Sequence, residues 1–153
     1  MGAQFVRVWR AGVKVRPTID QLRVIVGGLE NEVRKLPPVD LPVRHYFSPG
    51  CYARELFIPA GTVLTGKIHK YQQLNILSQG EISVLTEDGV KRVKAPFTVV
   101  SPAGTKRIAY AHTDCTWTTI LATDETDPDV IEDEFTAATD EEYLEFRKCL
   151  LPA

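Results

Sequence analysis

Lys67 and His69 are the side chains of this sequence whose types and spacing most suggest a binding site. They stand two residues apart, and alternate side chains of a β-strand project from the same face, so both would point to one side of a sheet. Gln73 and Asn75 have the same spacing on the next predicted strand and would add amide groups on one face of that strand. An ammonium group, an imidazole and two amides can hold a small anion through charge and hydrogen bonds.

Short β-strands must position these side chains, because the apolar residues between 43 and 122 follow a period of two and turn residues interrupt them. Asp88-Gly89 is typical of a two-residue hairpin. The pattern predicts about eight strands, at residues 51–58, 62–68, 74–77, 81–86, 90–94, 97–100, 106–111 and 115–122. No helical periodicity falls between them, so the predicted fold class is mainly β, a sandwich or a small antiparallel barrel.

The spacing of glycines and polar residues in this segment resembles the first motif of the cupin superfamily, which is Gly, five residues, His, one, His, three or four, Glu, six, Gly. Here Gly61, Lys67, His69, Gln73 and Gly80 stand at those positions. Both glycines are present, but lysine and glutamine replace two metal ligands and one histidine remains. The resemblance implies a cupin-type jelly-roll barrel over residues 41–123 that holds no metal or other cofactor, since protonated lysine is a poor ligand.

The second cupin motif is Pro, one residue, Gly, two, His, three, Asn, and the chain has Pro102, Gly104, Arg107 and Ala111 in those places. If Arg107 takes the histidine's position, it points into the same cavity and offers a guanidinium fork to a phosphate or carboxylate. The anion-binding residues implied are Lys67, His69, Gln73, Asn75 and Arg107. A shift of one residue in strand register would instead leave both cations on the outer surface.

Binding of a small anionic molecule without chemistry, such as a nucleotide or a sugar phosphate, is the function these residues favour. The segment also has a looser resemblance to short cupin-like proteins of tailed bacteriophages, in the runs Gly66-Lys67-Ile68-His69, Val99-Val100-Ser101-Pro102 and Gly104-Thr105-Lys106-Arg107. That resemblance implies a phage protein in a bacterial cytoplasm, where one task would be to sequester a host signalling nucleotide.

Two alternatives stay open. The first is an enzyme of the epimerase, isomerase or phosphodiester-cleaving lyase type, with His69 as the base, Tyr71 or Tyr110 as the acid and the two cations stabilising negative charge. Glu55 or Asp114 would have to orient the imidazole. The second is a structural phage subunit, with the barrel as a scaffold and both ends of the chain as assembly arms.

The segments on either side of the predicted barrel differ sharply in charge. Residues 1–123 hold 16 of the 18 Lys and Arg and 9 of the 20 Asp and Glu, whereas residues 124–153 hold 2 and 11. We expect the acidic segment to fold back on the basic body or on that of a neighbouring subunit. The predicted organisation is an arm and helix at 1–40 with the helix at 17–35, the barrel at 41–123, and helices at 129–134 and 139–150 within 124–153.

Composition excludes several classes of protein. No apolar run approaches the length of a membrane-spanning helix, and the scattered basic residues lack the aromatic neighbours of a nucleic-acid binder. The first ten residues lack the apolar stretch of a signal peptide, and three cysteines without metal-ligand spacing favour reduced thiols in the cytoplasm. The arm Phe5–Trp9 and the apolar stripe of the helix predict a homo-oligomer, most simply a dimer, in which residues 1–35 contribute to the interface.

Overall fold

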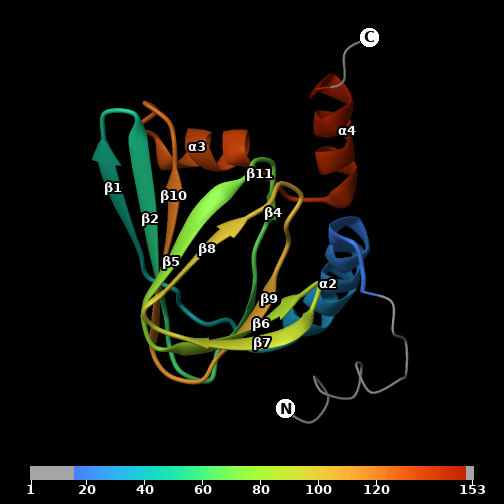
Figure 1. The fold of residues 1–153 in the computed structure, drawn as a ribbon, viewed down its shortest axis with the longest axis vertical. Coiled ribbons are helices and arrows are strands. Elements are labelled where there is room, and N and C mark those ends of the chain that lie inside the picture. Colours follow the sequence, from blue (N-terminus) through green and yellow to red (C-terminus); the bar gives the residue numbers. More distant parts are fainter. Residues whose placement is uncertain (1–15, 151–153) are drawn as a thin grey trace.

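Within residues 16–150, most strands form two antiparallel sheets that face each other and curl into a barrel, with three helices outside (Figure 1). The structure is a computed structural model that describes residues 16–150. The helices are α2 (Ile19–Val33), α3 (Pro128–Phe135) and α4 (Asp140–Leu150). The strands are β1 (Val43–Ser48), β2 (Cys51–Ile58), β3 (Val63–Thr65), β4 (Ile68–His69), β5 (Gln73–Gln79), β6 (Glu81–Thr86), β7 (Gly89–Lys94), β8 (Phe97–Ser101), β9 (Ile108–Ala111), β10 (Cys115–Leu121) and β11 (Thr136–Ala137).

The larger sheet has the strand order β1-β2-β10-β5-β8 and the smaller one β3-β9-β6-β7, while β4 pairs with β11. Apolar side chains from the two sheets meet between them. Leu77 and Ile58 from the larger sheet pack with Ile82 and Ala109 from the smaller one, and all four are buried. Because side chains alternate along a strand, these residues identify the inner face of each sheet, which is needed to place the candidate site.

The mainly β fold predicted from the sequence is confirmed, and β2 and β6 have the predicted bounds. The strand expected at residues 62–68 is divided into β3 and β4, because the chain leaves the ladder at Gly66 and Lys67. Two strands were missed. β1 is exposed over most of its length, and β11 has only two residues, so neither carries an alternating pattern long enough to recognise.

Helix α2 begins as the sequence predicts, with a capping box in which Thr18 and Gln21 bond each other's backbone N–H groups. Its buried residues Leu22 and Val26 pack against Leu85 and Ile108, on the outer face of the smaller sheet. The barrel of the same chain therefore covers this stripe, and the stripe does not require a second subunit. The predicted arm at residues 5–15 lies outside the described residues.

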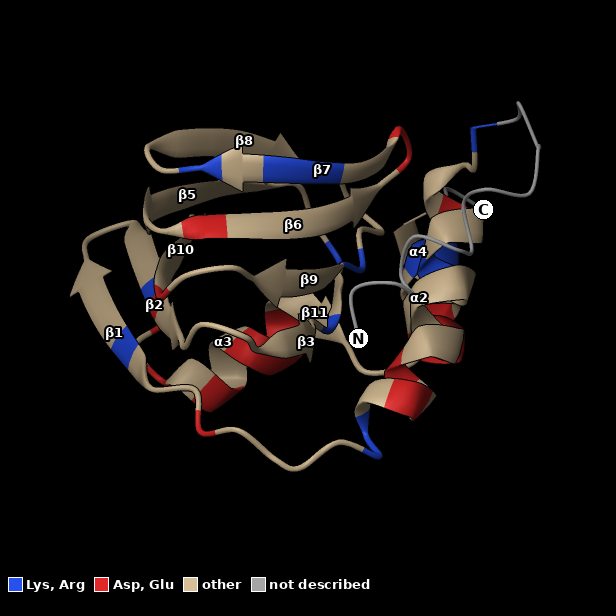
Figure 2. Cartoon of the chain, turned by 90° about the horizontal axis from the view of Figure 1, so that it is seen from below, with Lys and Arg blue, Asp and Glu red and all other residues tan. Residues whose placement is uncertain are grey.

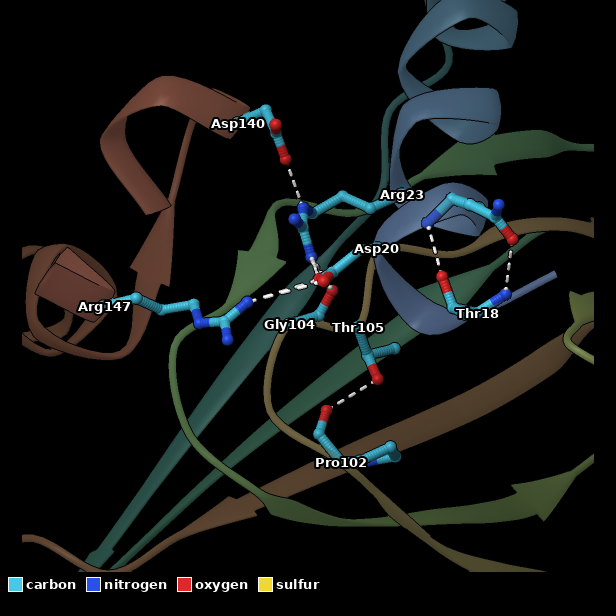
Figure 3. A network of polar contacts seen from close by, with 9 residues as sticks. Thr18, Asp20, Arg23, Pro102, Gly104, Thr105, Asp140 and Arg147 are labelled. Atoms are coloured by element: carbon cyan, nitrogen blue, oxygen red, sulfur yellow. Dashed lines mark hydrogen bonds and ion pairs between the residues drawn. The ribbon is translucent and has the colours of Figure 1, made fainter. Parts of the chain in front are cut away.

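Helices α2 and α4 lie one beyond the other along one flank of the barrel and are joined by Arg23 (Figures 1 and 3). Arg23 is 3% exposed, and its guanidinium donates to Asp140 and to Asp20 and lies over the ring of Tyr143. It also donates to the carbonyl oxygen of Gly104 at 3.3 Å. Arg23 thus ties both helices to the turn between β8 and β9.

The acidic C-terminal segment folds back on the basic body of the same chain, as one of the two expected arrangements. Asp140 pairs with Arg23, and Glu142 lies 3.6 Å from the ammonium group of Lys70. Figure 2 shows that α3, like α4, carries several acidic residues. None of the helices described is both long and apolar enough to cross a membrane.

Candidate functional site

Backbone hydrogen bonds bring the two motif segments together at His69. Its N–H donates to the carbonyl of Thr105 at 3.0 Å, and its carbonyl accepts from the N–H of Gly104 at 2.8 Å. On the other side of β4, His69 pairs with Thr136 of β11. The histidine is therefore held between a turn of the second motif and a strand from the C-terminal segment.

The side chain of His69 is mostly buried, and its ring contacts the side-chain amide of Gln73. Burial, together with the positive charges of Arg107 and Arg54, lowers the pKa of His69 to about 4. The imidazole is therefore neutral at pH 7, with one ring nitrogen that accepts a hydrogen bond and one N–H that donates. A neutral histidine between cations is the chemical centre of the candidate site.

The lowered pKa predicts how stability depends on pH. The unfolded chain takes up a proton at residue 69 below about pH 6.5, whereas the folded protein does so only near the value of about 4. Acidification from pH 6 to pH 5 should then cost about 1 kcal/mol of unfolding free energy at this residue, before most carboxyl groups titrate. We expect His69→Gln to remove that loss in urea unfolding at the two pH values. Equal losses in wild type and variant would contradict the assignment.

Arg54 is a site residue that the sequence analysis missed. It alternates along β2 with Leu56 and Ile58, which pack in the core, so its side chain projects from the inner face. It is half-buried, and no ion-pair partner for it occurs among residues 16–150. The alternation of the strand was visible in the sequence, but only the core contacts show which face of β2 is the inner one.

The two cations predicted for the site both have acidic partners. Arg107 lies close enough to His69 to act on its pKa, and its guanidinium is 3.2 Å from Glu87. Lys67 lies at the rim of the barrel, where its ammonium group is 3.3 Å from the carboxylate of Glu132 on α3. Neither cation is an isolated surface charge, and a role of both in anion binding stays a prediction.

The two predicted amides are both buried on the inner face, with different roles. Gln73 contacts His69, as described above. Asn75 donates to Ser101 at 3.0 Å and accepts from Trp117 at 3.3 Å and from Thr119 at 2.8 Å. Its carbonyl oxygen is thus already bonded twice, so Asn75 links three strands of the larger sheet and has one remaining N–H to offer a ligand.

The tyrosines proposed as acids lie elsewhere. The ring of Tyr71 packs against Phe135 and Phe146, and the ring of Tyr110 packs edge-on against His112. Among the described residues, neither tyrosine has a recorded contact with His69. The structure therefore does not assemble the acid–base pair that the enzyme alternative requires from these residues.

The carboxylates proposed to orient His69 are also engaged elsewhere. Glu55 lies 3.8 Å from Arg44 on the outer face, and Asp114 accepts from the backbone N–H of Ala60 at 2.9 Å. The tyrosine on the inner face is Tyr52, whose hydroxyl lies 2.7 Å from Nδ1 of His45 in a hydrogen bond. Burial raises the pKa of Tyr52, so it stays protonated.

A divalent metal ion of the kind that the cupin motifs usually bind does not fit the side chains around His69. His45 bonds Tyr52 and His112 bonds Ser83, so neither turns toward His69. Guanidinium groups beside the remaining imidazole would repel a divalent cation. Within the described part of the chain, no three His, Cys, Asp or Glu side chains come together as a metal ion needs.

An open groove of about 610 Å³ adjoins the site where the strands of the larger sheet end under α3. It is lined by the apolar side chains of Leu74, Ile120 and Phe135, and Gln73 reaches it from the inner face. Gln73 therefore lies between the groove and His69. The groove provides space beside the site, while the charged groups lie on the barrel side of that glutamine.

The fold is similar to that of several solved structures. Ectoine synthase from P. lautus matches with a TM-score of 0.51 and 16% identity, over 69% of this chain and 83% of that one. KdgF from Halomonas sp. matches with a TM-score of 0.49 and 18% identity, over 61% and 88%. A cupin-2 domain containing protein from Shewanella frigidimarina matches with a TM-score of 0.46 and 14% identity, over 61% and 92%.

No protein-family model and no curated protein matches the sequence. The low identities to solved structures bear on architecture alone. That architecture consists of two facing antiparallel sheets. Gly80 and Gly104, which stand at the glycine positions of the two motifs, have positive φ angles of 90° and 81° in their turns. Together with the match at a TM-score of 0.51, these features show that the chain has the cupin fold.

Proposed function

We propose that this protein binds a small anionic ligand at the end of its barrel. The observation that carries the proposal is Arg54, a half-buried cation on the inner face that has no ion-pair partner among residues 16–150 and acts on the pKa of His69. Arg107 adds a second guanidinium, and Lys67 adds an ammonium group at the rim. Two guanidinium groups that act on a neutral imidazole favour an anion, because arginine binds oxyanions through charge-assisted hydrogen bonds.

The pKa of about 4 at His69 favours binding over catalysis. A general base works best when its pKa lies near the operating pH, and an imidazole this acidic abstracts protons weakly. Gln73 contacts the ring instead of an orienting carboxylate. We therefore infer that His69 acts as a hydrogen-bonding group toward the ligand and that the protein works without a metal or another cofactor.

A phosphate monoester, such as a nucleotide or a sugar phosphate, fits the proposed site better than a monocarboxylate. A phosphate group presents three oxygens and up to two negative charges, enough for both Arg54 and Arg107. Sequestering a signalling nucleotide in a bacterial cytoplasm is one use of such a site, and this use rests only on the looser phage resemblance.

The predicted homo-oligomer also stays a prediction. Residues 1–15, which were expected to contribute to its interface, lie outside the described residues.

The proposal predicts that Arg54→Met weakens anion binding at least about tenfold, since a lost hydrogen bond to a charged group is worth about 1.5–3 kcal/mol. Isothermal titration of the full chain with inorganic phosphate, pyrophosphate, AMP and glucose 6-phosphate measures the effect. Arg44→Met is the matched control, because Arg44 lies on the neighbouring strand and pairs with Glu55 on the outer face. Absence of binding in the wild type, or equal weakening by both substitutions, would refute the proposal.

A further inference from the structure

Helix α3 lies at the end of the barrel that carries the candidate site (Figures 1 and 2). The strand that follows the helix, β11, pairs with β4, so Thr136 lies opposite His69. Lys70, the residue after His69, donates from its backbone to the carbonyl of Phe135 at 2.8 Å and from its ammonium group to the carbonyl of Asp133 at 2.7 Å. The C-terminal end of α3 is thus fastened to the strand that presents His69.

The middle of α3 is held by different contacts. Ile131 is the buried residue of this helix, and Glu132 next to it reaches Lys67 at 3.3 Å. Both partners of this ion pair are about half exposed, at 44% for the lysine side chain and 48% for the glutamate. Exposed ion pairs are weak because water and salt screen them, so this contact exchanges easily for another.

Glu132 also faces the buried part of the site. Its negative charge contributes to the raised pKa of Tyr52, after burial, while the positive charge of Arg54 acts on the same hydroxyl in the opposite direction. Glu132 and Arg54 therefore lie near one phenol, on which their charges compete. A carboxylate that pairs with Lys67 competes with any anion that binds this ammonium group.

We propose that Glu132 is a built-in competitor of the ligand, and that its carboxylate holds the place at Lys67 that the anionic group of the ligand takes on binding. This inference rests on the proposed function. Binding would release the side chain of Glu132 from Lys67, while Lys70 keeps the backbone of the last turn of α3 fastened. Because the two events are linked, removing the glutamate's charge must strengthen anion binding by the amount that its competition costs.

Titration of the full-length chain with pyrophosphate tests this inference. We expect Glu132→Gln to lower the dissociation constant about three- to tenfold. The matched control is Glu134→Gln, which removes the same charge from the same helix at an exposed residue that has no ion-pair partner among the described residues.

The outcomes separate this inference from the proposal on which it rests. If wild type and both variants fail to bind pyrophosphate or any of the other anions, the proposed function is wrong and the inference falls with it. If all three bind equally, or if Glu134→Gln gains as much as Glu132→Gln, the site binds anions but Glu132 does not compete.

Discussion

Replacing Gly80 with alanine is expected to destabilise the protein by about 4 kcal/mol or more, a large share of the total stability of a domain of this size. Gly80 has a φ of +90°, and an added Cβ would lie 2.2 Å from the carbonyl oxygen of Asp114 and 2.7 Å from Sγ of Cys115. These atoms belong to the start of β10 and to the core. The backbone of the larger sheet would have to move, because no flexible side-chain end is available to give way.

Gly89→Ala separates the two causes of this loss. Gly89 has a φ of +97° in the hairpin between β6 and β7, and nothing lies within 4 Å of its added Cβ. The substitution therefore meets only the conformational strain, which we expect to cost about 1–2 kcal/mol. Urea unfolding of both variants measures the difference, and similar losses would show that the contact at Asp114 is relieved at little cost.

Arg23→Met is expected to cost about 3 kcal/mol of unfolding free energy, near the lower end of what breaking a buried ion pair costs. Methionine keeps much of the packing volume but leaves Asp140 and the carbonyl of Gly104 without their guanidinium donor, and it leaves Asp20 with only Arg147, 3.5 Å away. The loss is moderated because both carboxylates have access to water and can be hydrated. Helices α2 and α4 should loosen together, since this side chain joins them (Figure 3).

The control for this prediction is Arg34→Met. Arg34 follows the last turn of α2 and is largely exposed, with Glu30 3.5 Å away as its partner. Exposed pairs of this kind contribute about 0.5 kcal/mol or less, so the variant should unfold close to wild type. Chemical denaturation followed by circular dichroism compares the two, and a loss below about 1 kcal/mol for Arg23→Met would mean that the network in Figure 3 adds little stability.

Much of the fold was predictable because it depends on local patterns. The period of two and the hairpin signal at Asp88-Gly89 identified the strands, and the motif glycines indicated their turns. The cap at Thr18 likewise depends on neighbours within one helical turn. Features of this kind need only residues that are close in the sequence, which is why the expected and observed bounds agree so well for β2 and β6.

The site was predictable only in part, because its missing members depend on contacts that are distant in the sequence. The second motif indicated Arg107 as a candidate, and the charge of Arg107 acts on the pKa of His69. Arg54 lies outside both motifs, and its inward direction depends on which face of β2 meets the smaller sheet. Nothing in the acidic segment predicted that Glu132 would reach Lys67, since many carboxylates there have the same local surroundings.

Gly104 in the second motif has consequences for how this chain and its relatives would vary together. An added Cβ there would lie 2.8 Å from the hydroxyl of Tyr143 and 3.1 Å from the guanidinium of Arg23. On a bare barrel, asparagine could replace a glycine at positive φ, since it tolerates that conformation. In this protein the side chains of α2 and α4 that pack at the turn leave no room for asparagine. Positions 23, 104 and 143 should therefore change together in an alignment of homologues. A glycine at position 104 is required by α2 and α4 as much as by the turn itself.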